Sequence, residues 1–284
     1  MWFCDALASG FQQPTDPVRL QIFRIVFGTV VAMRFLLSFG QGGWHRFTDG
    51  SLSAHLAETR CGPVRARLLL TLYQPALIVR AAAAVALAAG VLPRAALLLV
   101  LAGAAMELSY LKSPNAVRYT LLTGGCLLLA GDLGAGLHLT HGSTTANTWA
   151  QALLVLVTTD IYWNSAWQKL RSPQFRSGLY LAQWVHVYDQ VREQLPYRRQ
   201  HAVPGGVRRA MGGLTHRDIC LWRLVAAVVI ALEIVLPPAL LVQETMPYAV
   251  VAGVGMHAAF TCLKPRQLLT FSGLTVGTYI AFAA

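Results

Sequence analysis

The sequence predicts an all-α polytopic integral membrane protein, a bundle of about eight transmembrane helices in a single domain (1–284). Charged residues make up only 12% of the 284 residues, against roughly 25% in soluble domains. The mean hydropathy is positive, at +0.51. Apolar stretches recur at lengths close to the roughly 20 residues that cross a bilayer. The expected location is the cell membrane, as a multi-pass integral protein with the lipid bilayer as a partner.

Each predicted span is an apolar segment bounded by polar or turn-forming residues. The eight segments are 18–39, 69–91, 94–111, 116–137, 148–168, 220–242, 247–263 and 267–283. Pro93, Pro114 and Pro247 fall at turns between spans, where a missing backbone N–H is harmless. One long basic connection, 172–217, has an amphipathic part (Leu179 to Leu195) and then a part rich in proline, glycine and arginine.

The net charge of +11 comes from arginines and lysines that lie between apolar segments rather than on one polar face. This distribution is typical of membrane-flanking residues, so no nucleic-acid partner is expected. With eight spans, most basic residues fall in loops on one side, which the positive-inside rule assigns to the cytoplasm. Arginines that bind an anionic substrate would produce the same pattern.

Several ionisable residues lie inside the predicted spans, where each costs at least a few kcal/mol in contact with lipid. They are Arg24, Arg34, Arg80, Glu107, Asp160, Arg223, Glu233 and His257. They are expected to face the bundle interior, a cavity or a partner. Structural ion pairing is the expected role of Arg24 and Glu233. His257 lies among small residues and either hydrogen-bonds between helices or lines a site.

Lys169 lies at the end of an apolar segment. The chain has 23 lysines and arginines, and only three of them are lysines. Arginine keeps its proton in proteins, whereas a partly desolvated lysine can lose it. Lys169 is therefore a candidate catalytic base. The alternative is a lysine that reaches back to the membrane interface, as lysines at helix ends commonly do.

Aromatic and polar side chains precede Lys169 within two helical turns. They are Tyr162, Trp163, Asn164 and Trp167. Tyr162 and Lys169 are seven residues apart and so share one helix face, with Ser165 and Ala166 between them. A ring-lined, partly polar pocket at membrane depth suits a lipophilic aromatic ligand. An aromatic belt at the headgroup level explains the tryptophans equally well.

No metal is expected as a cofactor. The HExxH, GxSxG, P-loop and Rossmann patterns do not occur in a suitable context. His138 and His141 form an HxxH pattern in a short loop, but no carboxylate or cysteine lies close to them in the sequence.

Four segments, in order over about residues 14–282, form a wider pattern. They are Pro14 to Pro17 with Leu20, Phe23-Arg24 and Phe27-Gly28; Lys112 to Leu122 with Asn115 and Tyr119; Tyr162 to Leu170 with Phe175 and Gly178; and Met256-His257 with Phe271-Ser272-Gly273. This pattern resembles the HTTM family, the membrane domain shared by vitamin K-dependent gamma-glutamyl carboxylase and its bacterial relatives.

The resemblance implies a reaction class. In the carboxylase, a lysine at the position of Lys169 deprotonates reduced vitamin K. Oxygen then gives an epoxide and a strong base that removes a glutamate gamma-proton, and carbon dioxide adds. The implied cofactors are reduced vitamin K or another quinol and O2, with CO2 if the protein is a carboxylase. The implied site has Lys169 as base and a pocket lined by Tyr162, Trp163, Trp167, Asn115 and His257.

The chain departs from the carboxylase in two places. The carboxylase has a histidine near its asparagine motif, and Asn115 to Tyr119 has none. A large domain that follows its spans has no counterpart before Ala284. The first hypothesis is a quinol-dependent, carboxylase-like membrane enzyme acting on a peptide or lipophilic substrate. The alternative is a non-catalytic membrane partner, similar to the SdpB-like relatives, in maturation, export or immunity of a secreted peptide.

Overall fold

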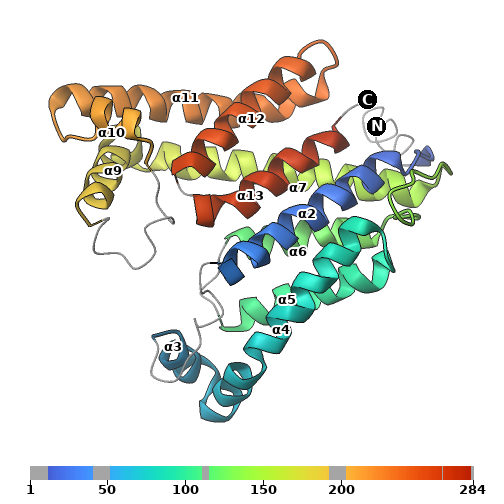
Figure 1. Ribbon diagram of the computed structural model, residues 1–284. Helices are drawn as coiled ribbons and strands as arrows, with labels where there is room; N and C mark the ends of the chain where they lie inside the picture. The colour runs from blue at the N-terminus through green and yellow to red at the C-terminus, as the bar shows by residue number, and fades with distance from the viewer. Residues whose placement is uncertain (1–11, 41–51, 111–114, 192–202, 264, 283–284) are drawn as a thin grey trace. The chain divides into compact units, whose positions relative to one another are not determined.

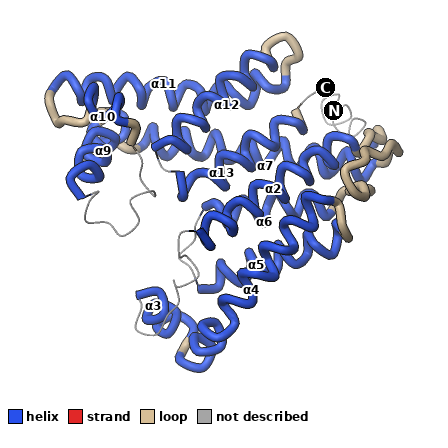
Figure 2. Tube along the Cα trace, in the orientation of Figure 1, coloured by secondary structure: helices blue, strands red, loops and turns tan. Residues whose placement is uncertain are grey.

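The computed structural model describes residues 12–40, 52–110, 115–191, 203–263 and 265–282. The regular structure of these residues is helical throughout, apart from one isolated backbone bridge between Thr15 and Thr144 (Figures 1 and 2). The prediction of an all-α protein is therefore confirmed for the described residues.

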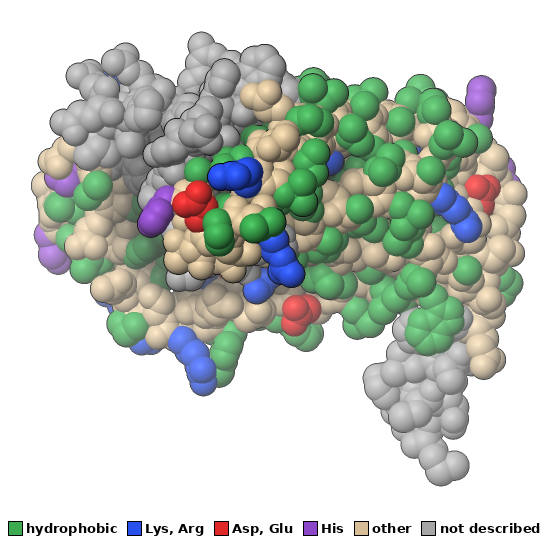
Figure 3. Space-filling view, turned by 90° about the horizontal axis from the view of Figure 1, so that it is seen from below, with side chains coloured by type: hydrophobic (Ala, Val, Ile, Leu, Met, Phe, Trp, Pro, Cys, Tyr) green, Lys and Arg blue, Asp and Glu red, His purple; other side chains and the backbone are tan. Residues whose placement is uncertain are grey.

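A helix occurs at each segment predicted to span the membrane, although two of them, Asn115–Leu128 and Pro265–Thr278, have only 14 residues each. These helices are α2 (Val18–Gly40), α4 (Pro63–Ala89), α5 (Pro93–Tyr110), α6 (Asn115–Leu128), α7 (Thr145–Arg171), α11 (His216–Leu241), α12 (Met246–Leu263) and α13 (Pro265–Thr278). Among the described residues, three of them (α4, α11 and α12) are long and apolar enough to cross a membrane. Apolar side chains also spread over the described part of the face drawn in Figure 3, which supports membrane association.

The span predicted at 116–137 is shorter than expected, because α6 ends at Leu128 and a loop follows it. Gly134 and Gly136 take positive φ angles of 71° and 62°, which a right-handed helix excludes. The Asp132 side chain accepts a hydrogen bond from the Gly134 N–H at 2.8 Å. Such a local side-chain bond gives the backbone an alternative to the helix. The hydropathy of 116–137 does not record this bond, so the loop was not predicted.

The chain divides into two compact units, Met1–Leu154 and Val155–Ala284, with the boundary inside α7. In the N-terminal unit α2 packs on α4, α4 on α5, and α5 on α6. Gly28 lets α2 approach α4 closely, because a Cβ there would lie 2.6 Å from the Ala88 backbone nitrogen. The assignment of residues 1–284 to a single domain remains a prediction, because a division into two compact units does not test it.

Arg24 departs from the predicted ion pairing. Its side chain is completely buried, and its guanidinium donates to the carbonyl oxygens of Gly136 at 2.8 Å and Gly134 at 3.5 Å. No carboxylate among the described residues lies within ion-pair distance of it. Backbone carbonyls of a loop that turns back over α2 satisfy the arginine, which ties that loop to the helix.

Ion pairing inside the N-terminal unit involves Glu107 on α5 instead. One carboxylate oxygen accepts from Arg34 on α2 at 2.8 Å, and the other accepts from Arg80 on α4 at 2.6 Å. The Arg80 guanidinium also lies over the Phe35 ring, 4.6 Å from its centroid. Three helices are thus joined through one buried carboxylate, in agreement with the expected structural role of ion pairs within the bundle.

In the C-terminal unit α11 packs on α12, and α12 on α13. Three shorter helices, α8 (Pro173–Arg176), α9 (Leu179–Val191) and α10 (Gly205–Met211), pack together with the beginning of α11. Trp222 of α11 is buried among them, against Ala182 and Val185 of α9, and its indole N–H donates to the Met211 carbonyl at 2.9 Å.

The predicted connection at 172–217 is therefore folded structure over its described residues, 172–191 and 203–217. Gly178 permits the tight turn between α8 and α9. Its φ is +77°, and a Cβ there would meet the Arg223 backbone nitrogen at 2.3 Å. The apolar face of the amphipathic α9 covers Trp222 rather than lying alone on a membrane surface.

The loop after α6 is expected to lose stability in acid. The pKa of Asp132 lies below its ordinary value, because the Thr140 hydroxyl and the Gly134 N–H donate to the ionised carboxylate. A depressed folded-state pKa gives stability that is present above the unfolded pKa of about 4 and is lost as the pH falls through the folded pKa.

The measurement is amide hydrogen exchange of residues 129–144 in detergent, from neutral pH down to about pH 3, corrected for the intrinsic pH dependence of exchange. Asp132→Asn should remove most of the acid-induced loss of protection. Glu244→Gln, an exposed change in the turn between α11 and α12, is the control and should leave that loss in place. An unchanged acid response in Asp132→Asn would contradict the assignment.

Candidate functional site

One face of α7 carries the site residues of the C-terminal unit. Tyr162 and Ala166 are buried, with Ser165 and Lys169 partly buried beside them. These four residues share a face as their spacing predicts. Trp163 and Trp167 are more than half exposed. Trp163 donates its indole N–H to the Ile234 carbonyl at 3.2 Å, and Trp167 stacks with Arg171.

Lys169 forms an ion pair with Glu233 of α11, through the carboxylate oxygen Oε1. The Lys169 Nζ also donates to Ser165 Oγ at 2.7 Å, and the Ser165 hydroxyl donates to the same Oε1 at 3.0 Å. The Glu233 side chain is 4% exposed and that of Lys169 is 20% exposed. Glu233 thus has the predicted ion pair, and its partner is the candidate base itself.

Two aromatic rings flank the Lys169 amine. The Nζ atom lies 5.6 Å from the centroid of Phe175 on α8 and 6.0 Å from that of Phe260 on α12. Ammonium groups at such distances are attracted by the face of a ring. The rings also displace water from part of the amine, which strengthens its interaction with Glu233. The aromatic side chains next to the Lys169 amine are therefore Phe175 and Phe260, rather than the tryptophans that the sequence suggested.

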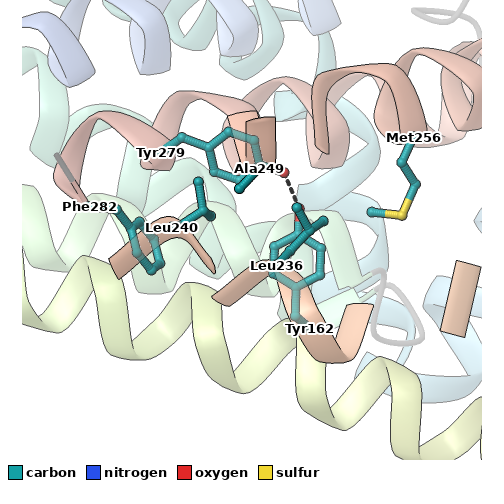
Figure 4. Packing of buried hydrophobic residues seen from close by; sticks show 7 residues of the cluster. All are labelled: Tyr162, Leu236, Leu240, Ala249, Met256, Tyr279 and Phe282. Atoms are coloured by element: carbon teal, nitrogen blue, oxygen red, sulfur yellow. Dashed lines mark hydrogen bonds between the residues drawn. The ribbon is translucent and has the colours of Figure 1, made fainter. Parts of the chain in front are cut away.

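A second buried polar cluster joins four helical segments, α7, α12, α13 and the 3-10 turn that follows α13. The Tyr162 hydroxyl is hydrogen-bonded to His257 Nε2 at 2.8 Å. It is also hydrogen-bonded to the hydroxyl of Tyr279 (Figure 4). Tyr279 belongs to η3 (Tyr279–Ala281), the 3-10 turn after α13. The other ring nitrogen of His257, Nδ1, lies 3.2 Å from Ser272 Oγ on α13. All four side chains are buried.

The two tyrosines belong to a buried apolar cluster. Its other members include Leu236 and Leu240 of α11, Met256 of α12, and Phe282 (Figure 4). Because both nitrogens of His257 are bonded, the histidine meets the expectation of a residue that hydrogen-bonds between helices. The Phe260 ring lies near both clusters, 5.8 Å from the His257 ring centroid and 6.0 Å from the Lys169 amine.

Tyr279, Ser272 and Glu233 complete the clusters, and local sequence patterns did not select them together. Tyr279 lies 117 residues from Tyr162, and Glu233 lies 64 residues from Lys169. Gly253 gives one usable signal, since a Cβ there would lie 2.3 Å from the Tyr279 hydroxyl. A glycine inside an apolar helix often marks a close approach by a neighbour.

Asn115 is the first residue of α6 and belongs to the N-terminal unit. Its side chain is outside the described part of the chain, as is Lys112, so the place of Asn115 in a quinone pocket stays a prediction. The described residues contain no group of three or more His, Cys, Asp or Glu placed to hold a metal ion. His141 of the HxxH pattern lies 2.9 Å from an Asp16 carboxylate oxygen.

Comparison with known proteins leaves the site to be interpreted from its own geometry: no family model, no curated protein and no solved structure matches this chain. The HTTM resemblance therefore remains an expectation that rests on the residues quoted for it. The geometry offers an amine paired with a buried carboxylate, beside a hydrogen-bonded chain of two tyrosines and a histidine.

Proposed function

We propose that the C-terminal unit contains the base of a quinol-dependent, carboxylase-like membrane enzyme, and that Lys169 accepts a proton from a phenolic hydroxyl of a reduced quinone. One observation carries the proposal. The Lys169 amine lies between two aromatic rings and contacts a buried carboxylate, yet a fifth of its side chain remains exposed. A base needs this combination of low polarity and access.

The residues around Lys169 fit a flat aromatic ligand with hydroxyl groups. The Phe175 and Phe260 rings lie 5.6 and 6.0 Å from Nζ, and a ligand ring bound near the amine would pack against them. The second carboxylate oxygen of Glu233, Oε2, is buried and has no hydrogen-bond partner among the described residues. A ligand hydroxyl could satisfy it. A bound reduced quinone would supply an acidic hydroxyl and reducing equivalents, with O2, and CO2 for a carboxylase, as the further reactants that the resemblance implies.

Each protein group has a definite task in this proposal. Lys169 accepts the proton at Nζ, and Ser165 fixes the direction of the amine through its hydroxyl. The rings of Phe175 and Phe260 limit the access of water to the amine. Tyr162 is bonded to His257 and Tyr279 and so holds α7, α12 and η3 in register, which positions the lysine two turns further along α7.

The proposal includes the membrane placement of the whole chain, as a multi-pass protein with eight spans in the cell membrane. Helices at all eight predicted segments support it. So do the internal partners of the charges within those helices, Arg34 and Arg80 with Glu107 and Lys169 with Glu233.

Turnover of a reduced naphthoquinone by the purified protein, followed as quinol oxidation in detergent, is the direct test. Lys169→Ala is expected to lower the rate by roughly 10²–10⁴-fold, the usual contribution of a positioned general base. Lys169→Arg should fail as well, because arginine does not release its proton. Gln168→Ala, an exposed change one residue earlier on α7, should keep the rate.

Full turnover in Lys169→Arg would show that a fixed charge is enough and would reject the base. Absence of turnover in the unchanged protein would favour the SdpB-like alternative, a non-catalytic partner for a secreted peptide or small protein. Arg176, Arg208 and Arg209 are exposed on α8 and α10 and give that alternative a charged surface to test by charge reversal. Such reversal should leave quinol turnover by an enzyme in place.

A further inference from the structure

Two glutamates, Glu107 and Glu233, are buried in the described part of the chain, and they have chemically different partners. The Glu107 side chain is 10% exposed and that of Glu233 is 4% exposed. Glu107 is held by two arginines, whereas Glu233 is held by a lysine. An arginine stays charged in proteins, so the carboxylate beside it stays ionised. A lysine can pass its proton to the carboxylate, and the two pairs can therefore differ in protonation.

The two carboxylates also differ in their hydrogen bonds, and the difference again favours a charged Glu107 over a charged Glu233. Glu107 uses both oxygens, one for Arg34 and one for Arg80. Glu233 uses only Oε1, which accepts from both Lys169 and Ser165. Its Oε2 is buried without a hydrogen-bond partner in the described part of the chain. A carboxylate oxygen that is buried and unbonded is costly while it carries charge.

We infer that Lys169 and Glu233 form a proton-exchange pair, in which a proton moves from the Lys169 amine to the Glu233 carboxylate and leaves both groups neutral. The N–H bond breaks with its electron pair remaining on Nζ, and an O–H bond forms on the carboxylate. Neither an oxidant nor a reductant is needed. The neutral amine then has a lone pair with which to accept a proton from a bound acid.

Desolvation favours the neutral form of the pair. Each buried ion costs several kcal/mol in a low-dielectric interior, and an ion pair recovers this only when further hydrogen bonds satisfy its atoms. Ser165 supplies one such bond to Oε1. No second cation among the described residues lies within ion-pair distance of Glu233. The use of the pair in catalysis rests on the proposed function, while the exchange itself does not.

Infrared spectroscopy of the purified protein, in a detergent without ester groups, reads the protonation of Glu233 directly. At neutral pH the unchanged protein should show the carbonyl stretch of a protonated carboxylic acid, shifted in D2O. Glu233→Gln should remove this band. Lys169→Arg should remove it too, because the guanidinium keeps Glu233 ionised. Glu107→Gln is the matched control and should leave the band in place.

A carboxylic acid band that is absent from the unchanged protein, or that survives Glu233→Gln, would overturn the inference. The D2O shift uses the unchanged protein and so does not depend on the folding of any variant. No quinone enters the measurement. A protein that shows the band but does not turn over a quinol would therefore refute the proposed function and retain the proton-exchange pair.

Discussion

Glu107→Gln is expected to lower the free energy of unfolding by about 3–5 kcal/mol, the range for breaking a buried ion pair by removing one partner. The change takes away the carboxylate that Arg34 and Arg80 share. The Arg80 side chain is only 7% exposed, and a guanidinium cannot shed its charge to adapt. The measurement is equilibrium unfolding in detergent by circular dichroism.

Glu233→Gln is the matched control, because it makes the same change at a second glutamate that is buried in the described part of the chain. Lys169 can stay neutral beside a glutamine, so no unpaired buried charge remains and the expected loss is smaller, about 1–2 kcal/mol for the hydrogen bonds. Adding Arg80→Leu to Glu107→Gln should recover part of the lost stability, since a buried charge is replaced by an apolar group. Equal and small losses in both single variants would contradict this account of the two glutamates.

Gly253→Ala is expected to cost about 1–3 kcal/mol, the usual range for overpacking a well-packed interior. The new methyl group would lie 2.3 Å from the Tyr279 hydroxyl and 2.8 Å from two ring carbons. Tyr279 must then move and release Tyr162, with which its hydroxyl is bonded (Figure 4). Thermal unfolding in detergent measures the loss, and ultraviolet difference absorption reports the changed surroundings of the tyrosines.

Gly255→Ala is the control on the same helix. Nothing lies within 4 Å of a Cβ at that position, so the change should be neutral or stabilising by up to about 1 kcal/mol. Tyr279→Phe added to Gly253→Ala should recover part of the loss by removing the hydroxyl. If Gly253→Ala and Gly255→Ala were equally stable, Tyr279 would not be packed against Gly253.

The sequence located the helices because apolar segments must satisfy their own backbone hydrogen bonds when they enter a membrane. It failed where side chains act on the backbone nearby. Asp132, Gly134 and Gly136 form part of the loop that replaces the end of the fourth predicted span. It also missed the folding of 172–217, whose described helices acquire a core only when Trp222, from the next long helix, packs between them.

Sequence periodicity also placed Tyr162, Ser165 and Lys169 on one face of α7, since a helix repeats every 3.6 residues. Only the tertiary structure decided what that face meets. Lys169 donates a hydrogen bond to Glu233, and Tyr162 is hydrogen-bonded to Tyr279 and His257. These partners come from helices far along the chain. The rotation of each helix about its axis depends on how neighbouring surfaces pack, which no local pattern records.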